Sequence, residues 1–290
     1  MFMLLFITLT LSKSYDCGTD VDCTMNGVTL IVSGRWVRKY RRDYNRRRSY
    51  IHWEDSFSNC KFLTKIAIST SVTSIGNSAF YSCTSLSSID ISNNIISIGD
   101  YAFEPCTSLT KVNIGNSVST IGEYAFYNCM SLTSIDVDTS NPSYSSLDGV
   151  LYNKDKTLLI QYPIGNSRTS YSIPPSVTVI GESAFWHCTS LTSINIPDSV
   201  TEIDDFAFES CITLTCVSYE GTKEITNIGK EIFGFSSINS IHVPDNYEKD
   251  TFATYKIIKD NKICDKDNTD GAEPKMITTI IACLLVLIIF

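Results

Sequence analysis

Cysteine and histidine are the residues of this 290-residue chain best suited to chemistry, as nucleophiles, bases or metal ligands. The chain has eleven cysteines but only three histidines, His52, His187 and His242. His187 directly precedes Cys188, an arrangement that could pair a thiolate with a base. No two cysteines stand in the Cys-x-x-Cys spacing typical of zinc sites, so we expect no metal site and no cofactor.

The spacing of the cysteines indicates which elements position them. Six cysteines follow a 23-residue step, namely Cys60, Cys83, Cys106 and Cys129, then Cys188 and Cys211. Three of them, Cys83, Cys106 and Cys129, each end a copy of the motif Ile-Gly-x-x-Ala-Phe-x-x-Cys. Self-similarity at a fixed step of this length predicts a repeat architecture.

Each repeat unit predicts one strand and one return. The pattern Leu-x-x-Ile-x-Ile has the period-two alternation of a strand. Eight strands are expected, centred near Ala67, Asp90, Asn113, Asp136, Ser172, Asn195, Ser218 and His242. The Ala-Phe-x-x-Cys segment predicts a short helical turn that points Phe and Cys inward. Stacked units would bury these side chains and align the strands into one parallel ribbon.

Two further features of the repeat carry structural predictions. Gly76, Gly99, Gly122 and Gly181 follow an isoleucine, which predicts a tight turn with positive φ. From Cys129 to Cys188 is 59 residues, which equals two steps of 23 plus an insertion of 13. Two β-type runs around a polar four-residue turn predict that this insertion, near residues 139–162, contains a hairpin.

The repeats resemble the leucine-rich repeats of the BspA-like surface-protein family, which is found in bacteria and in mucosal protists. The matching motif, Ile-Gly-x-x-Ala-Phe-x-x-Cys-x-Ser-Leu-x-x-Ile-x-Ile, covers residues 57–244. The resemblance implies a leucine-rich-repeat solenoid, a right-handed β/α superhelix with a ribbon of parallel strands and short helical or irregular returns. Residues 26–34 are similar to the strand that caps the N-terminal end in that family, whereas the arginine-rich segment after them departs from it.

What the resemblance implies about function is adhesion. We expect a non-enzymatic cell-surface protein that binds protein or glycan ligands on other cells or on matrix. The alternative is a structural surface-coat protein without a specific ligand. His187 fits this picture, because its repeat position is held elsewhere by Ser82, Asn128 and Ser210. We therefore interpret it as a surface turn residue and expect no catalytic site.

The outward strand positions are the predicted ligand-binding surface, because solenoids of this kind bind along that face. The residues expected to bind are Lys65, Ser88, Asp90, Lys111, Asn113, Ser134, Asp136, Ser193 and Asn195. Ala67, Cys216 and Ser218 belong to the same strip, which is small and polar and lacks aromatic residues. The alternative interpretation is plain solvated surface.

The cysteines divide into two predicted groups. Those on the 23-residue step point in parallel into the core, so we expect buried thiols rather than disulfides between neighbours. Cys17 and Cys23 lie in the N-terminal cap, Cys216 occupies an outward strand position, and Cys264 lies in the C-terminal flank. Disulfides Cys17–Cys23 and Cys216–Cys264 are expected to staple the two ends.

Charge is distributed unevenly along the chain. The net charge of −8 argues against nucleic acid as a partner. Eight basic residues and one acid nevertheless give residues 35–48 a charge of +7. The residues expected to bind polyanions are Arg41, Arg42, Arg46, Arg47 and Arg48. A solvated loop in the cap is the alternative.

The two ends of the chain predict export and attachment. Residues 1–14 are interpreted as a signal peptide and residues 15–56 as an N-terminal cap. Residues 245–275 form a C-terminal flank and acidic stalk, followed by an uncharged hydrophobic tail at residues 276–290. This tail is expected to hold the protein at the membrane, either as a span or as a signal that is exchanged for a lipid anchor.

Overall fold

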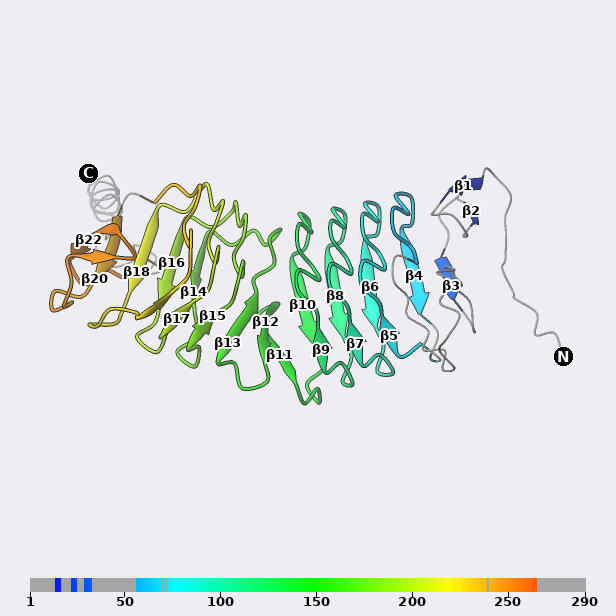
Figure 1. The fold of residues 1–290 in the computed structure, drawn as a ribbon, viewed down its shortest axis with the longest axis horizontal. Coiled ribbons are helices and arrows are strands. Elements are labelled where there is room, and N and C mark those ends of the chain that lie inside the picture. The colour runs from blue at the N-terminus through cyan, green and yellow to red at the C-terminus, as the bar shows by residue number, and fades with distance from the viewer. Residues whose placement is uncertain are drawn as a thin grey trace, which may run out of the picture.

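The chain folds into an elongated solenoid whose coils stack along the long axis (Figure 1). The computed structural model describes residues 56–264 apart from residues 69, 71 and 239, together with the backbone of three short strands before residue 33. These described residues form strands and turns and contain no helix. Accordingly, none of their elements is a helix long and apolar enough to cross a membrane.

Two ribbons of longer strands form one side of the solenoid. The first ribbon, in the order β10-β8-β6-β4-β3, comprises β3 (Thr29–Val32), β4 (Lys65–Ile68), β6 (Ser88–Ile91), β8 (Lys111–Ile114) and β10 (Ser134–Val137). The second, in the order β14-β16-β18-β20-β22-β21, comprises β14 (Ser170–Ser172), β16 (Ser193–Ile196), β18 (Cys216–Tyr219), β20 (Ser240–Val243), β21 (Thr251–Phe252) and β22 (Tyr255–Lys259). All eight predicted repeat strands are therefore present.

Shorter strands form a second ladder. Its first sheet comprises β5 (Ser74–Ile75), β7 (Ser97–Ile98) and β9 (Thr120–Ile121). Its second sheet comprises β11 (Tyr144–Leu147), β12 (Val150–Asn153), β13 (Leu158–Gln161), β15 (Val179–Ile180), β17 (Glu202–Ile203) and β19 (Asn227–Ile228). Near the start of the chain, β1 (Ser14–Asp16) pairs antiparallel with β2 (Asp22–Thr24).

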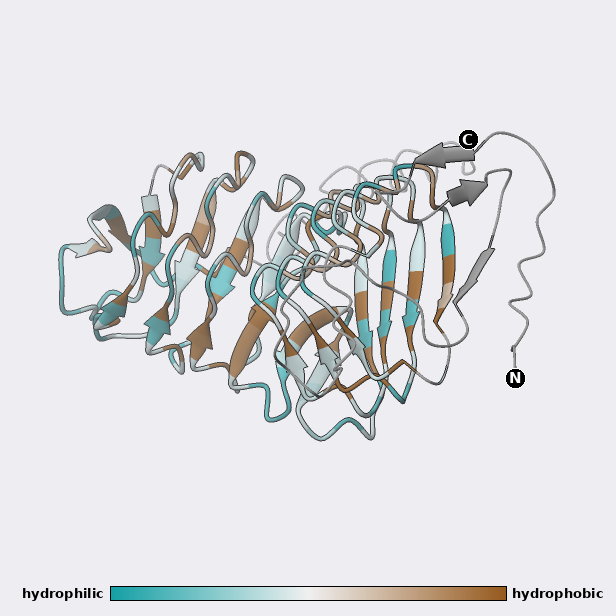
Figure 2. Ribbon diagram, turned by 45° about the vertical axis from the view of Figure 1, so that its right-hand side comes forward, coloured by the Kyte–Doolittle hydropathy of each residue, from teal (hydrophilic) through white to brown (hydrophobic). Residues whose placement is uncertain are grey.

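The 23-residue step sets the register of the parallel strands. Ile89 of β6 lies opposite Val112 of β8, and Val112 lies opposite Ile135 of β10. These three side chains are buried, whereas their neighbours along each strand point outward, as the period-two alternation predicts. Figure 2 shows the resulting alternation of hydrophobic and hydrophilic residues along the strands.

The returns between strands are irregular runs of turns, not the helical turns predicted for the Ala-Phe-x-x-Cys segments. Their amide groups donate to carbonyl groups of the next coil, as in Ser78 N to Asp100 O and Phe80 N to Ala102 O, both 2.8 Å. Ser78 and Ser82 adopt positive φ of 52° and 59°, which redirects the backbone between successive turns. Bonds between coils alternate with bonds inside the segment, such as Tyr81 N to Ser78 O at 3.0 Å, so no continuous helical ladder forms.

The repeated glycines have a different cause from the one predicted. Gly99, Gly122 and Gly181 do not have positive φ, and Gly149 is the described glycine that does. A Cβ atom on Gly99 would lie 2.5 Å from the backbone nitrogen of Asn77, and one on Gly122 would lie 2.4 Å from that of Asp100. Close approach of neighbouring coils therefore requires glycine at these positions.

The core is organised around stacked aromatic rings. Phe57, Phe80, Phe103 and Phe126 stack in order with ring centroids 5.2–5.5 Å apart. A second stack of Tyr162, Phe185, Phe208 and Phe233 has spacings of 4.9–5.1 Å. The five phenylalanines predicted to anchor the repeat, Phe80, Phe103, Phe126, Phe185 and Phe208, are all buried.

The cysteines on the 23-residue step are buried and form no disulfide, as predicted. Each thiol of Cys83, Cys106 and Cys129 donates to the carbonyl of a phenylalanine 26 residues earlier, at 3.0–3.3 Å. Burial raises the pKa of Cys129 to about 12. These thiols therefore act as small core side chains and stay protonated at neutral pH.

The insertion divides the ribbon in two, so the single continuous ribbon that we predicted is wrong. β12 pairs antiparallel with both β11 and β13, and β13 then pairs parallel with β15. The edge of β10 is occupied by this insertion, because Ile135 N donates to Gly149 O at 2.8 Å and Val137 N to Ser146 Oγ at 2.9 Å. The buried residues accordingly form two core clusters that meet at the insertion, since Leu151 belongs to the first cluster and Val150 and Tyr152 belong to the second.

Candidate ligand-binding face

The outward side chains of the first ribbon form a strip that is open to solvent. We define this open strip as the outward positions of β4, β6, β8 and β10, which are Lys65, Ala67, Ser88, Asp90, Lys111, Asn113, Ser134 and Asp136. Four of them, Lys65, Asp90, Lys111 and Asn113, are exposed, and the other four are half-buried. The backbone fixes their spacing, because each strand is held in register by the ladder beneath.

Side chains of the open strip interact from strand to strand. Lys111 Nζ lies 2.8 Å from Asp136 Oδ2, and Ser134 Oγ donates to Asp136 Oδ1 at 2.9 Å. The amide of Asn113 donates to the carboxylate of Asp90 on the preceding strand. The hydrogen bond and charge of Asp136 raise the pKa of Lys111. The open strip is therefore a row of hydrogen-bond donors and acceptors that hold one another in position. Its two lysines and two aspartates give it no net charge.

Several outward positions of the second ribbon are buried, which corrects two predicted site residues, whereas Ser172 of β14 is exposed. Ser193 and Asn195 are only 9% and 6% exposed, and Ser218 is 1% exposed. Asn195 is tied into the neighbouring coils, because its amide donates to Glu220 Oε1 at 2.6 Å and its oxygen accepts from Ser218 Oγ at 2.8 Å. We call Ser193, Asn195, Cys216, Ser218 and His242 the covered strip.

The covering chain is the segment that follows β22. A disulfide joins Cys216 of β18 to Cys264 with a Cα–Cα distance of 5.8 Å, which is the pairing that we expected. Cys264 N also donates to Ser218 Oγ at 3.1 Å, so the segment lies directly over β18. The burial of Ser193 and Asn195 was not predicted, although the expected disulfide places Cys264 beside β18.

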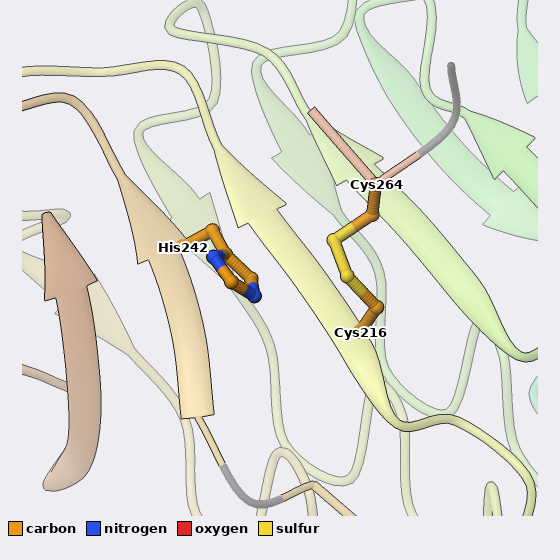
Figure 3. Close-up of side chains that lie close together, drawn as sticks. All are labelled: Cys216, His242 and Cys264. Atoms are coloured by element: carbon orange, nitrogen blue, oxygen red, sulfur yellow. A yellow bond between two sulfur atoms is a disulfide. The ribbon is translucent and has the colours of Figure 1, made fainter. Parts of the chain in front are cut away.

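His242 of β20 lies beside this disulfide (Figure 3). One sulfur of each cysteine and one ring nitrogen of His242 lie within 4.8 Å of one another. The other side of the ring is held by Asp260, whose carboxylate oxygens lie 2.9 and 3.0 Å from His242 Nδ1. The sequence placed His242 near the centre of a strand, but we did not predict this cluster, whose members come from three separate segments.

His187 lies in a turn, but this turn belongs to the junction between the two core clusters. The neighbouring Trp186 contacts Tyr127 with ring centroids 4.2 Å apart and packs against the first cluster. His187 itself is half-buried and has a positive φ of 56°. Burial raises the pKa of Cys188, which opposes formation of a thiolate nucleophile beside His187.

Several predicted features lie outside the described residues. They are the signal peptide, the arginine cluster at Arg41, Arg42, Arg46, Arg47 and Arg48, the disulfide Cys17–Cys23, and the hydrophobic tail at residues 276–290. Within the described part, a cavity of about 10 Å³ beside Phe80 has room for no more than one water molecule. This cavity is therefore too small to hold a ligand.

The repeat and its stacking correspond to a known family. Six copies of the BspA type leucine-rich repeat region match the chain, over residues 52–153 and 165–269. The chain belongs to this family. The predicted fold class and family are thereby confirmed, and the gap between the two matched ranges falls at the end of the insertion in the BspA-type solenoid. The matched family describes a repeat region and not a catalytic domain.

A solved structure of a similar protein supports the same fold for this BspA-type chain. The pneumococcal vaccine antigen PcpA is 21% identical with a TM-score of 0.53, covering 71% of this chain and 63% of that chain. A leucine-rich cell surface protein from Faecalibacterium prausnitzii is 23% identical with a TM-score of 0.46, covering 72% of this chain and 76% of that chain. This chain thus spans less than two thirds of the PcpA chain. No curated protein matches it.

Proposed function

We propose that this protein acts at a cell surface, where it binds a macromolecular ligand of protein or glycan type along the open strip. The observation that carries the proposal is the row of exposed and half-buried polar side chains on four strands held in register, in contrast to Ser193, Asn195 and Ser218 of the second ribbon, which are buried. The surface location is supported by family membership and by the F. prausnitzii relative, which is described as a cell surface protein.

The chemistry of the open strip favours an extended, polar ligand. Parallel strands are about 4.8 Å apart, so the four strands present equivalent groups at that spacing. Lys65, Asp90 and Lys111 stand exposed on three successive strands and alternate in sign. Such a surface can make charge-assisted hydrogen bonds to a polar partner without offering a broad apolar contact.

A charge-reversal pair tests this assignment. Binding of the purified protein would be measured to a panel of immobilised matrix proteins, mucin and sulfated glycans. We expect the double variant Lys111→Glu, Asp90→Lys to show no binding to those panel members that bind the wild-type protein. Lys61→Glu is the matched control, since Lys61 is exposed on a return turn of the same solenoid and outside the strip. Equal binding by both variants would contradict the proposal.

The alternative is a surface-coat protein without a specific ligand. It predicts that the wild type binds no member of the panel above background. It also predicts concentration-dependent self-association, which analytical ultracentrifugation would detect. A monomer that binds a panel member excludes it.

The arginine cluster is proposed as a second, polyanion-binding element. The support is its sequence alone, since eight basic residues and one acid fall within residues 35–48. Replacing Arg46, Arg47 and Arg48 by Ser should make the protein elute earlier from heparin, with no change in its melting temperature. Identical elution of the variant and the wild type would contradict polyanion binding by the cluster and would favour the alternative of a solvated loop.

The uncharged tail at residues 276–290 is proposed to hold the protein at the membrane. Release of surface protein by a phosphatidylinositol-specific phospholipase would identify a lipid anchor. Carbonate-resistant retention that the lipase does not affect would identify a span. Soluble protein that retains the tail would refute both forms of attachment.

A further inference from the structure

The segment after β22 passes over the second ribbon beside β18 and β20. This corner of the molecule contains side chains of the types that bind metal ions. Two sulfur atoms and one imidazole nitrogen converge there from β18, β20 and the segment after β22. Thiolate and imidazole are the ligands that zinc prefers in proteins, and three protein ligands leave a fourth position for water. These residues belong neither to the open strip nor to the repeat motif.

A carboxylate already holds the imidazole of His242. Asp260 lies at 2.9 Å from His242 Nδ1, which leaves Nε2 as the nitrogen free to coordinate. A carboxylate on the far nitrogen fixes the tautomer and the orientation of a metal-binding histidine. Asp260 is itself held, because its Oδ1 accepts from Lys262 N at 3.1 Å. The imidazole is thus oriented before any metal arrives.

Accessibility separates these cysteines from the other described ones. Cys216 and Cys264 are half-buried, so that a reductant or a metal ion can reach them. Cys106 and Cys129 are 0% exposed, and their thiols donate to backbone carbonyls inside the core. Chemistry at the disulfide can therefore proceed without opening the solenoid.

We propose that reduction of the Cys216–Cys264 disulfide creates a zinc site whose ligands are the two sulfurs and His242 Nε2, with Asp260 as the positioning residue. An external dithiol supplies two electrons and two protons, the S–S bond breaks, two S–H bonds form, and the dithiol becomes a disulfide. Zinc then replaces the proton on each sulfur, forming two Zn–S bonds and releasing two protons. Either the disulfide or the metal would hold the covering segment in place, so that the covered strip stays closed in both redox states.

The test uses the full chain and cobalt as a spectroscopic probe for zinc. After reduction and removal of the reductant without oxygen, we expect one equivalent of Co²⁺ to bind with thiolate-to-cobalt charge-transfer and tetrahedral d–d absorption. Zinc should displace it, and the oxidised protein should show neither band. Asp260→Asn should weaken Co²⁺ binding roughly 10- to 100-fold, because it removes the carboxylate that orients His242 but leaves the three ligands in place.

Three variants locate the site. Cys216→Ser and His242→Ala should each abolish the tetrahedral spectrum, whereas His187→Asn should keep it, since Asn128 occupies the same repeat position. Circular dichroism of each reduced variant checks that the solenoid remains folded. Cys216→Ser retains Cys17 and Cys23, so an unchanged spectrum in that variant would place the metal elsewhere and overturn the proposal. A folded, reduced wild type that binds no Co²⁺ would overturn it as well.

Discussion

The two ribbons are built from the same repeat, yet they present different surfaces. The first stacks Phe80 on Phe103, the second stacks Phe185 on Phe208, and both keep their repeat cysteines buried and outside any disulfide. The outward positions of the first ribbon are exposed or half-buried, whereas Ser193, Asn195 and Ser218 are buried. The repeat therefore determines the core, and the segments between and after the repeats determine which part of the face is free to bind.

The largest effect is expected in the core, where the two ribbons should behave alike. Phe103→Ala and Phe208→Ala should each cost about 3–5 kcal/mol of unfolding free energy, because both rings are 0% exposed and stacked on both sides. Urea denaturation measures the loss. Phe235→Ala is the control: this ring is 84% exposed and its removal should cost less than about 0.5 kcal/mol. Equal losses for Phe103→Ala and the control would contradict the stacking.

The next effect should distinguish the ribbons. Replacing Cys216 and Cys264 by Ser removes a link across 48 residues, which should destabilise the second ribbon by roughly 2–4 kcal/mol. Both ends of the disulfide lie in the second ribbon or its flank, so the amides of the first ribbon should keep their protection against hydrogen exchange. Hydrogen exchange followed by peptide gives the two ribbons separately. An equal loss of protection in β6 and β18 would show that the ribbons unfold as one unit.

A smaller effect concerns the buried thiols. Burial raises the pKa of Cys129 from 9.0 to about 12, so the folded state keeps a proton that the unfolded state releases. Its contribution to stability is complete below pH 9.0 and is lost as the pH rises toward about 12, by up to ~1.4 kcal/mol per pH unit. Cys129→Ala should therefore flatten the dependence of unfolding free energy on pH in this window. An unchanged slope would mean that the thiol ionises normally in the folded protein.

The smallest effect on stability is expected at the open strip. Lys111→Ala should leave the urea midpoint unchanged, because its ion pair with Asp136 is solvent-exposed and water screens it. The same variant should weaken binding to whichever panel member the wild type recognises. A clear drop in the urea midpoint would indicate that Lys111 contributes to the stability of the fold, which would weaken its assignment as a ligand-binding residue.

The sequence predicted what the repeat itself encodes. The 23-residue step placed the eight strands, the buried phenylalanines and the buried cysteines, because local alternation and a constant period determine those positions. It gave the wrong reason for Gly99 and Gly122, since a close approach between coils is invisible without the stacking geometry. It also predicted helical turns where hydrogen bonds from coil to coil, such as Phe80 N to Ala102 O, hold irregular ones.

The candidate site was predicted only in part, because the burial of an outward side chain depends on residues that are distant in the sequence. Ser193 and Asn195 share the repeat position of exposed residues in the first ribbon, and nothing local distinguishes them. Asn195 is hydrogen-bonded to Glu220 and Ser218 of the next coil, and Ser218 in turn accepts from Cys264 N, so these contacts exist only in the folded chain. His242 of β20 was one signal available in advance. It occupies an outward position opposite Ser218 of β18, and Cys216 lies two residues before Ser218 on that strand. Reading the outward positions of neighbouring strands together would have found the cluster.

The most direct test of the difference between the ribbons compares two equivalent asparagines. Asn113 is exposed and Asn195 is 6% exposed, although both occupy the same position of the repeat. Maleimide labelling of Asn113→Cys and Asn195→Cys, located by peptide mass spectrometry, reports the accessibility of each. We predict that the oxidised N113C protein is labelled at once, while N195C is protected until a reductant opens the Cys216–Cys264 disulfide and a chelator removes metal. Equal labelling of the two oxidised proteins would contradict the account.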